Sequence, residues 1–325
     1  MHPTTPTPIF LFSLPRSGST LAQRVLAADN NIATTPEPWL LLPLVYSLKS
    51  EGMYTEYNHN VCAIALEGLC NELPNKKNDY QRHIHNFCTD IYKDLSKNNE
   101  LYFLDKTPRY HLISQDIVDI FPDSKYIYLW RNPLSIAASI IETWGEGRWS
   151  IYRFKIDLFE GLERLIETYS NQDSGISVRY EDLMTNKENW REIFDYLDLK
   201  FNPRVLSEFT QTQLPSELGD LTGSKAYNEV SSEPLEKWKK TMANPLRKAW
   251  CKRYLLWIGK ERLEIMGYDI DSLLKEISDI PFSFRYLISD MLWMPLGFLY
   301  CLTEPYVFIH KFRKILKWRH IHVHR

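Results

Sequence analysis

The sequence predicts an α/β fold in which a mostly parallel sheet is flanked by helices on both faces. Short β-rich runs recur along the chain, and each is followed by a segment of helical periodicity. Such alternation favours a parallel sheet because each helix carries the chain back to the edge where the next strand starts. With 325 residues, 44% of them hydrophobic, the chain can form one large domain or two modest ones with a substantial core.

The expected strands are short and apolar, and they are Ile9–Leu14, Leu101–Leu104, Lys125–Trp130 and Ile176–Arg179. The long helical stretch between the first two is interrupted by a polar linker, Leu73–Asp79. Later helical periodicity covers Tyr152–Tyr169, Glu181–Leu197 and Leu246–Met266. Residues 211–232 are rich in Gly, Ser, Thr and Asn, and they predict a loop that acts as a lid over a site.

Charge and cysteine content limit the classes of partner and compartment. The formal net charge is −2, yet the last sixteen residues carry six Lys or Arg and no acid. The rest of the chain is therefore mildly acidic, which argues against general nucleic-acid binding. The five cysteines form no CxxC pair, and no signal peptide is evident at the N-terminus. We therefore expect a cytoplasmic protein.

The segment Pro15–Thr20 lies between the first expected strand and a helix. The backbone N–H groups of such a turn, with those of the first helical turn, point at one spot that suits an anion. Gly18 permits close approach of a ligand, and Arg16 adds a fixed positive charge. Hydroxyl donors come from Ser17, Ser19 and Thr20. We predict a site for a phosphate or sulfuryl group, and a plain surface turn is the alternative.

A second motif follows the third strand. Arg131 ends that strand, Pro133 suits the first turn of a helix, and Ser139 lies two turns further on. A cation at the carboxyl end of a strand faces the crevice where open α/β sheets bind ligands. We therefore expect Arg131 to bind a second anion, unless it serves only in a surface ion pair.

Together with Val178–Leu183 after the fourth strand, these motifs resemble the sulfotransferases that use 3′-phosphoadenosine 5′-phosphosulfate (PAPS). The resemblance covers roughly Pro8–Asp269. It implies the P-loop-containing sulfotransferase fold, with the Pro15–Thr20 loop on the 5′-phosphosulfate and with Arg131 and Ser139 on the 3′-phosphate. It also places Tyr180 near the adenine and implies transfer to a hydroxyl or amine without a metal. The acceptor class stays open among glycans, lipids and small molecules.

The segment Asp105–Arg109 matches a catalytic segment of the same family, in which Lys106 would lie near the sulfuryl group with Arg16. The cytosolic small-molecule members have their catalytic His where this chain has Pro108. The chain therefore resembles the tyrosylprotein, glycan and bacterial members that use a Glu base, and the matching residue is Glu37. A Glu at a helix start is the structural alternative for that position.

Other residues compete for roles in this site. His111 and His59 are rivals for the base, although a lone His is more often structural. We expect Asp105 to pair with Lys106 or Arg109. Lys225 lies either on the 3′-phosphate or in solvent, and core packing accounts for Trp238.

The expected domains are a catalytic domain, residues 1–280, and a tail, residues 281–325. A helical insertion, about residues 45–96, would shape the acceptor cleft. The apolar run Tyr286–Leu302 contains Asp290, Pro295 and Gly297, and it is short for a span of about 20 residues. With the basic end it predicts an interfacial segment on the inner, anionic face of a membrane. A helix packed on the domain or on a second subunit is the alternative.

Two rival functions remain. A P-loop kinase-like enzyme would need a Lys before the final hydroxyl residue of the loop, and Ser19 occupies that position. A non-catalytic nucleotide-binding scaffold at a membrane would not need Glu37 and Lys106.

Overall fold

The computed structural model describes residues 5–172, 174–210 and 235–303, together with the isolated residues 308, 312, 322 and 323. Its centre is a five-stranded sheet with the order β2-β4-β1-β5-β6, in which each neighbouring pair is parallel. The strands are β1 (Thr7–Phe12), β2 (Ile32–Thr34), β4 (Tyr102–Asp105), β5 (Lys125–Trp130) and β6 (Ile176–Arg179). The predicted fold class, a mostly parallel sheet flanked by helices, is confirmed. A separate antiparallel pair joins β3 (Tyr54–Thr55) to β7 (His322–Val323).

Helices follow the strands in the order that the periodicity predicts. In the first half of the chain they are α1 (Ser19–Leu26), α2 (Leu41–Tyr46), α3 (His59–Glu72), α4 (Lys77–Leu95), α5 (Ser114–Ile120) and α6 (Pro133–Gly145). In the second half they are α7 (Leu162–Ser170), α8 (Tyr180–Thr185), α9 (Asn189–Tyr196), α10 (Val205–Glu208), α12 (Lys237–Thr241), α13 (Pro245–Ile258), α14 (Lys260–Ile265), α15 (Ile270–Asp279) and α16 (Leu287–Thr303). Tighter or wider turns form η1 (Pro108–Leu112), η2 (Ile151–Phe154) and η3 (Ile156–Gly161).

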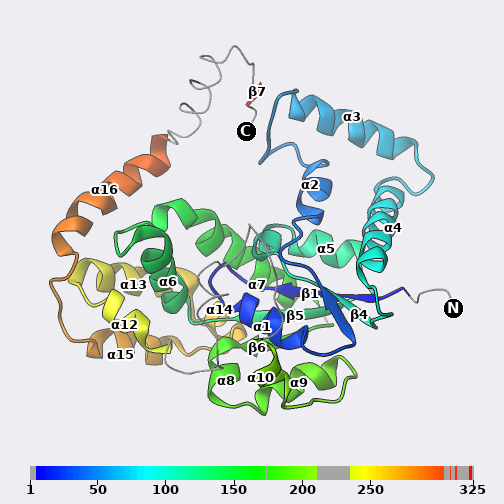
Figure 1. Cartoon of the computed structure of the whole chain (residues 1–325). Helices are drawn as coiled ribbons and strands as arrows, with labels where there is room; N and C mark the ends of the chain where they lie inside the picture. The colour runs from blue at the N-terminus through cyan, green and yellow to red at the C-terminus, as the bar shows by residue number, and fades with distance from the viewer. Residues whose placement is uncertain are drawn as a thin grey trace.

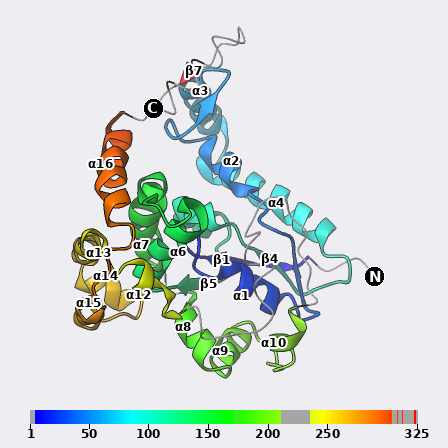
Figure 2. The same ribbon diagram turned by 60° about the vertical axis from the view of Figure 1, so that its left-hand side comes forward.

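The sheet has an apolar cluster on each face because successive strand side chains point to opposite sides. Phe10 and Phe12 of β1 face the larger cluster, which α5, α6, α7 and α13 cover. Ile9 and Leu11 face the smaller cluster, which α1, α8, α9 and α10 cover. Figure 1 shows α8, α9 and α10 below the sheet and α5, α6 and α7 above it, and the turned view in Figure 2 keeps the same layers.

Most differences from the predicted elements lie at their ends. β1 stops two residues early because Ser13 and Leu14 already belong to the loop, and the three-residue β2 was not predicted. The predicted linker does join two helices, α3 and α4. Gly259, with a φ of 83°, divides the predicted helix over Leu246–Met266. The predicted loop over 211–232 and its Lys225 lie outside the described residues.

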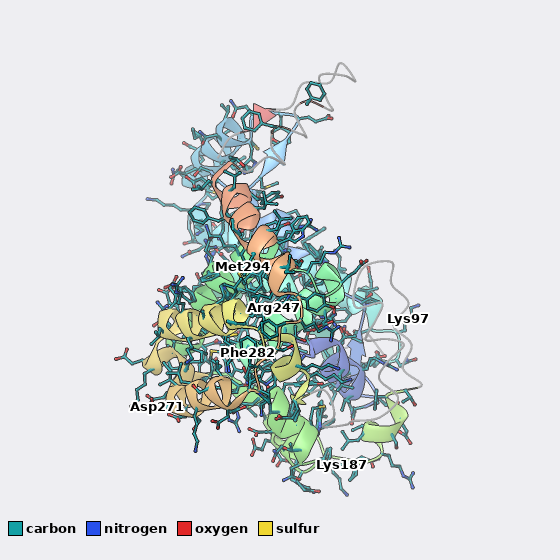
Figure 3. All side chains as sticks on the ribbon, turned by 90° about the vertical axis from the view of Figure 1, so that its left-hand side faces the viewer. Lys97, Lys187, Arg247, Asp271, Phe282 and Met294 are labelled. Atoms are coloured by element: carbon teal, nitrogen blue, oxygen red, sulfur yellow. The ribbon has the colours of Figure 1, made fainter. Side chains whose placement is uncertain are left out.

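The apolar run of the tail forms α16, which begins next to α13. Figure 3 shows Arg247 of α13 close below the start of α16. Among the described residues, no helix has the length and apolar content needed to cross a bilayer.

Candidate active site

The loop after β1 has an unusual backbone that shapes it as a cradle. Arg16 has a φ of 69° and Gly18 a φ of 88°, both in the left-handed region that residues with a Cβ rarely adopt. The carbonyl of Gly18 then accepts hydrogen bonds from the N–H groups of Leu21 and Ala22, which starts α1. A residue held in this region at a strand-to-helix turn is the kind of strain found at ligand sites.

Tyr180, the first residue of α8, lies directly on this loop. A Cβ added to Gly18 would stand 2.3 Å from Cε2 of Tyr180, so only glycine fits beneath the ring. Tyr180 follows β6, and β6 pairs with β5. The contact therefore brings the first and third predicted motifs together at the carboxyl ends of their strands.

Arg131, directly after β5, completes this junction. Its Nη1 donates to the carbonyl of Arg16 at 2.8 Å, and its Cζ lies 4.6 Å from the centre of the Tyr180 ring. Within the part of the chain that the structure describes, the buried Nε of Arg131 and the buried Oγ of Ser17 make no hydrogen bond. Buried donors of this kind are costly to leave unpaired. Their presence at one loop fits an anionic ligand.

Ser139 links the second motif to the side chain of Arg16. It lies on α6, which has Pro133 in its first turn, as predicted, and is capped by the side chain of Asn132. Nε of Arg16 donates to Oγ of Ser139 at 3.1 Å, and Cζ of Arg16 lies 5.6 Å from the ring of Trp144. The guanidinium of Arg16 is therefore held on the side of the loop that faces α6.

Lys106 and Glu37 form an ion pair beside the loop. Nζ of Lys106 lies 2.9 Å from Oε1 of Glu37 and 3.4 Å from Oγ1 of Thr20. The Lys106 side chain is 2% exposed and the Glu37 side chain 12%. Three residues from distant segments therefore meet: one at the start of α1, one after β2 and one after β4.

Trp39 orients the Glu37 carboxylate, and sequence reasoning did not identify it. Its Nε1 donates to Oε2 of Glu37 at 3.4 Å, and its backbone N–H donates to Oγ1 of Thr107 at 3.2 Å. Trp39 has a φ of 54°, which is rare for a bulky residue. Both oxygens of Glu37 are thus held, one by Lys106 and one by Trp39. Trp39 lies two residues after Glu37 in the sequence, with Pro38 between them. This short spacing was the signal that could have placed Trp39 at the site.

The part of the sequence that carries this site also matches a known protein family. A family model described as "Sulfotransferase family" matches residues 8–203, which include β1, β4, β5 and β6. The chain belongs to the sulfotransferase family.

Individual relatives agree with the family. The nodulation protein NoeE of Sinorhizobium fredii is 32% identical over 145 residues, which are 43% of this chain and 33% of that protein. A protein-tyrosine sulfotransferase of Drosophila melanogaster is 24% identical over 247 residues, 71% of this chain and 46% of that protein. The chain thus spans between a third and a half of these two relatives. The sulfotransferase domain of an olefin synthase from Synechococcus PCC 7002 shares the fold, with a TM-score of 0.50 at 21% identity over 83% of this chain and 98% of that domain.

Asp105 does not pair with Lys106 or Arg109, so that expectation was wrong. Its Oδ2 accepts hydrogen bonds from the hydroxyls of Tyr92, at 2.7 Å, and Tyr110, at 3.1 Å. Asp105 ends β4, so its side chain points away from that of the next residue, Lys106. Burial raises the pKa of the Asp105 carboxyl to about 7, although the two tyrosine hydrogen bonds act against the rise.

The Asp105 network also supports the Glu37 loop. Tyr110, which donates to Asp105, accepts a hydrogen bond from the backbone N–H of Leu41 at 3.2 Å. Leu41 begins α2, four residues after Glu37. Residues at the end of β4 therefore hold the Glu37 loop at three points. Lys106 binds Glu37 and Thr107 binds Trp39. Asp105 binds Leu41 through Tyr110.

The two rival histidines are engaged elsewhere. His111 is fully buried, and its Nε2 lies 2.8 Å from Oδ1 of Asp157, which also pairs with Arg109. Burial lowers the pKa of His111, so the ring is neutral near pH 7. Nε2 of His59 lies 2.7 Å from the carbonyl of Lys49. His111 is poorly placed to act as the base, because η1 turns its ring into the core beside Gly161.

Trp238 is 3% exposed and packs in the larger apolar cluster, as core packing predicts. No described group of three or more His, Cys, Asp or Glu side chains has an arrangement that could hold a metal ion.

Proposed function

We propose that this protein transfers a sulfuryl group from PAPS to a hydroxyl or amine of an acceptor, with Glu37 as general base. The observation that carries the proposal is the contact of Lys106 with both Glu37 and Thr20. It puts a carboxylate and a cation beside a loop whose amides and hydroxyls suit a phosphosulfate. Sulfuryl transfer to a hydroxyl or amine requires a base and positive charge at these positions.

The donor would be bound by the residues at the strand ends. The loop amides with Ser17, Ser19 and Thr20 would hold the 5′-phosphosulfate. Arg131 and Ser139 would hold the 3′-phosphate, and Tyr180 would lie near the adenine. The unpaired buried donors on Ser17 and Arg131 support this assignment, because a phosphate oxygen supplies the acceptors that they need.

Glu37 would take the proton from the acceptor group as its oxygen or nitrogen attacks the sulfur. The bond between that atom and sulfur forms while the bond from sulfur to the 5′-phosphate oxygen breaks. The electron pair leaves with 3′,5′-adenosine bisphosphate. Lys106 and Arg16 would neutralise the charge on the bridging and equatorial oxygens. Positive side chains would thus act where kinases use Mg²⁺.

The two rival functions are weaker. A kinase-like enzyme lacks its loop lysine here, because Ser19 stands in that position. A scaffold without turnover gives no reason to hold both oxygens of Glu37, one by Lys106 and one by Trp39.

The test is turnover of labelled PAPS by the full chain with a panel of glycan, lipid and phenol acceptors. We expect Glu37→Gln to lower turnover about 10²- to 10⁴-fold, the usual contribution of a general base. The amide keeps the shape of the carboxylate but cannot accept the proton, so affinity for the bisphosphate should change less than twofold. Glu192→Gln, at an exposed carboxylate of α9, is the matched control. Wild-type turnover in Glu37→Gln would refute the role of Glu37.

A further inference from the structure

The solvent side of α16 is apolar. Ile288, Leu292, Leu299 and Leu302 are 84%, 58%, 53% and 67% exposed, and Met291 is 58% exposed. Their spacing in steps of three, four and seven residues puts them on one side of the helix. In most surface helices the polar residues occupy that side. No Lys, Arg or Glu occurs in α16, so this side carries no charge.

The single charged residue of α16 faces inward instead. Asp290 is fully buried, and its two carboxylate oxygens accept hydrogen bonds from Nε and Nη2 of Arg247 at 2.6 and 2.9 Å. Asn244 donates to the same carboxylate at 2.7 Å. About two helical turns further along α16, Gly297 lies against the ring of Tyr152. A Cβ added to Gly297 would stand 2.5 Å from Cδ1 of Tyr152.

These contacts fix which side of α16 faces out. Rotation of the helix to bury its leucines would pull Asp290 out of the core and leave the buried guanidinium of Arg247 without its carboxylate, and breaking a buried ion pair is strongly unfavourable. The apolar side is therefore a stable feature of the folded domain. Contiguous exposed apolar surface of this kind marks an interaction site.

Exposed cations lie on two segments next to α16. Arg153 and Lys155 are exposed at η2, the element whose Tyr152 contacts Gly297 and Tyr300 of α16. Arg285 is exposed just before the helix. In the sequence, α16 is followed by a segment with six Lys or Arg and no acid, His310–Arg325. Apolar residues beside cations match a surface whose interior is hydrocarbon and whose headgroups are anionic.

We propose that α16 lies in the plane of an anionic lipid surface and holds the catalytic domain there through the Arg247–Asp290 pair. At about 1.5 Å per residue, a helix of this length is about 25 Å long, which suits lying in the interface rather than crossing the bilayer. Figures 1 and 2 show α16 standing at the outside of the domain beside α6 and α13, with no described helix on its outer side. The proposal does not depend on the identity of the donor or the acceptor.

The experiment is flotation of the full chain with vesicles, either of phosphatidylcholine alone or with about one third phosphatidylglycerol. We expect binding to the anionic vesicles and at least tenfold less to the neutral ones. Raising NaCl from about 0.05 to about 0.5 M should release much of the protein, because salt screens attraction to headgroups.

Variants separate the helix from general stickiness. Leu292→Glu with Leu299→Glu should reduce flotation at least tenfold. The matched control, Phe87→Glu with Leu95→Glu, changes two side chains of α4 that are 51% and 42% exposed, and it should bind as the wild type does. A thermal denaturation curve of each variant checks that both are folded.

Two results would overturn the proposal. One is equal flotation of the α16 variant and the wild type. The other is a wild type that ignores anionic vesicles but sediments as a dimer, with the α16 variant a monomer. That result would make this side of α16 a contact between two copies of the chain.

Discussion

Replacing Arg131 with Ala removes the cation that stands at the end of β5. In the structure this side chain touches the loop through the carbonyl of Arg16 and lies over Tyr180, and its Nε makes no hydrogen bond to any of the described residues. If Nε and the guanidinium charge bind the 3′-phosphate, the variant loses at least one charge-assisted hydrogen bond to that group.

The size of the loss follows from that contact. A hydrogen bond to a charged group contributes about 1.5 to 3 kcal/mol. The affinity for 3′,5′-adenosine bisphosphate should therefore fall about 10- to 150-fold. Adenosine 5′-phosphosulfate lacks the 3′-phosphate, so its affinity should fall less than threefold. Ser139→Ala should show the same selectivity with a smaller loss, because its hydroxyl carries no charge.

Isothermal calorimetry with both nucleotides gives the comparison, and a thermal denaturation curve of each variant checks that the loop has stayed folded. Arg131→Lys keeps the charge but not the forked geometry, and it should recover part of the affinity. An equal loss for both nucleotides would show that Arg131 acts by holding the Arg16 carbonyl, and it would refute a 3′-phosphate contact.

Three further changes test the surroundings of the site. Gly18→Ala should weaken bisphosphate binding at least tenfold in calorimetry, because the new Cβ meets Tyr180 in a backbone region that alanine avoids; unchanged binding would contradict the cradle. Asp105→Asn should flatten the pH dependence of stability in denaturant titrations. Burial raises the pKa of the Asp105 carboxyl to about 7 in the folded state. The free energy of unfolding of the wild type should therefore fall, relative to that of the variant, as the pH rises from about 4 to about 7. The fall is at most about 4 kcal/mol. A constant difference between the two curves would contradict that shift. His111→Gln should lower the free energy of unfolding by about 1 to 3 kcal/mol, because the buried Asp157 loses one of its two partners and keeps only Arg109, while turnover per folded molecule stays within threefold. A folded His111→Gln variant without turnover would return the base role to His111.

The sequence was a good guide where local chemistry alone sets the structure. The apolar runs over 125–130 and 176–179 form strands at those residues, and Pro133 does open a helix. Residues 15–20 form a strained strand-to-helix turn, as the glycine and the hydroxyls indicated. Parallel strands end at one edge, so motifs that follow different strands had to meet.

Features set by tertiary contacts were not predictable in the same way. The direction of Asp105 depends on two tyrosines from α4 and η1, and nothing local in the sequence favours them over Lys106. His111 turns inward because Asp157, far along the chain, accepts its hydrogen bond. The position of Trp39 depends on the short β2, whose three residues give too weak a pattern. The inward side of α16 is set by a single carboxylate whose partner, Arg247, is 43 residues away.

The most direct test of the central claim is a calorimetric titration of the full chain with 3′,5′-adenosine bisphosphate and, separately, with ATP and Mg²⁺. We expect the bisphosphate to bind at least tenfold more tightly, with the same affinity when EDTA is present, because in the proposed site Arg131 and the loop hydroxyls would bind the two phosphates without a metal. Tighter binding of ATP with Mg²⁺, or loss of bisphosphate binding in EDTA, would contradict the assignment of PAPS as the donor.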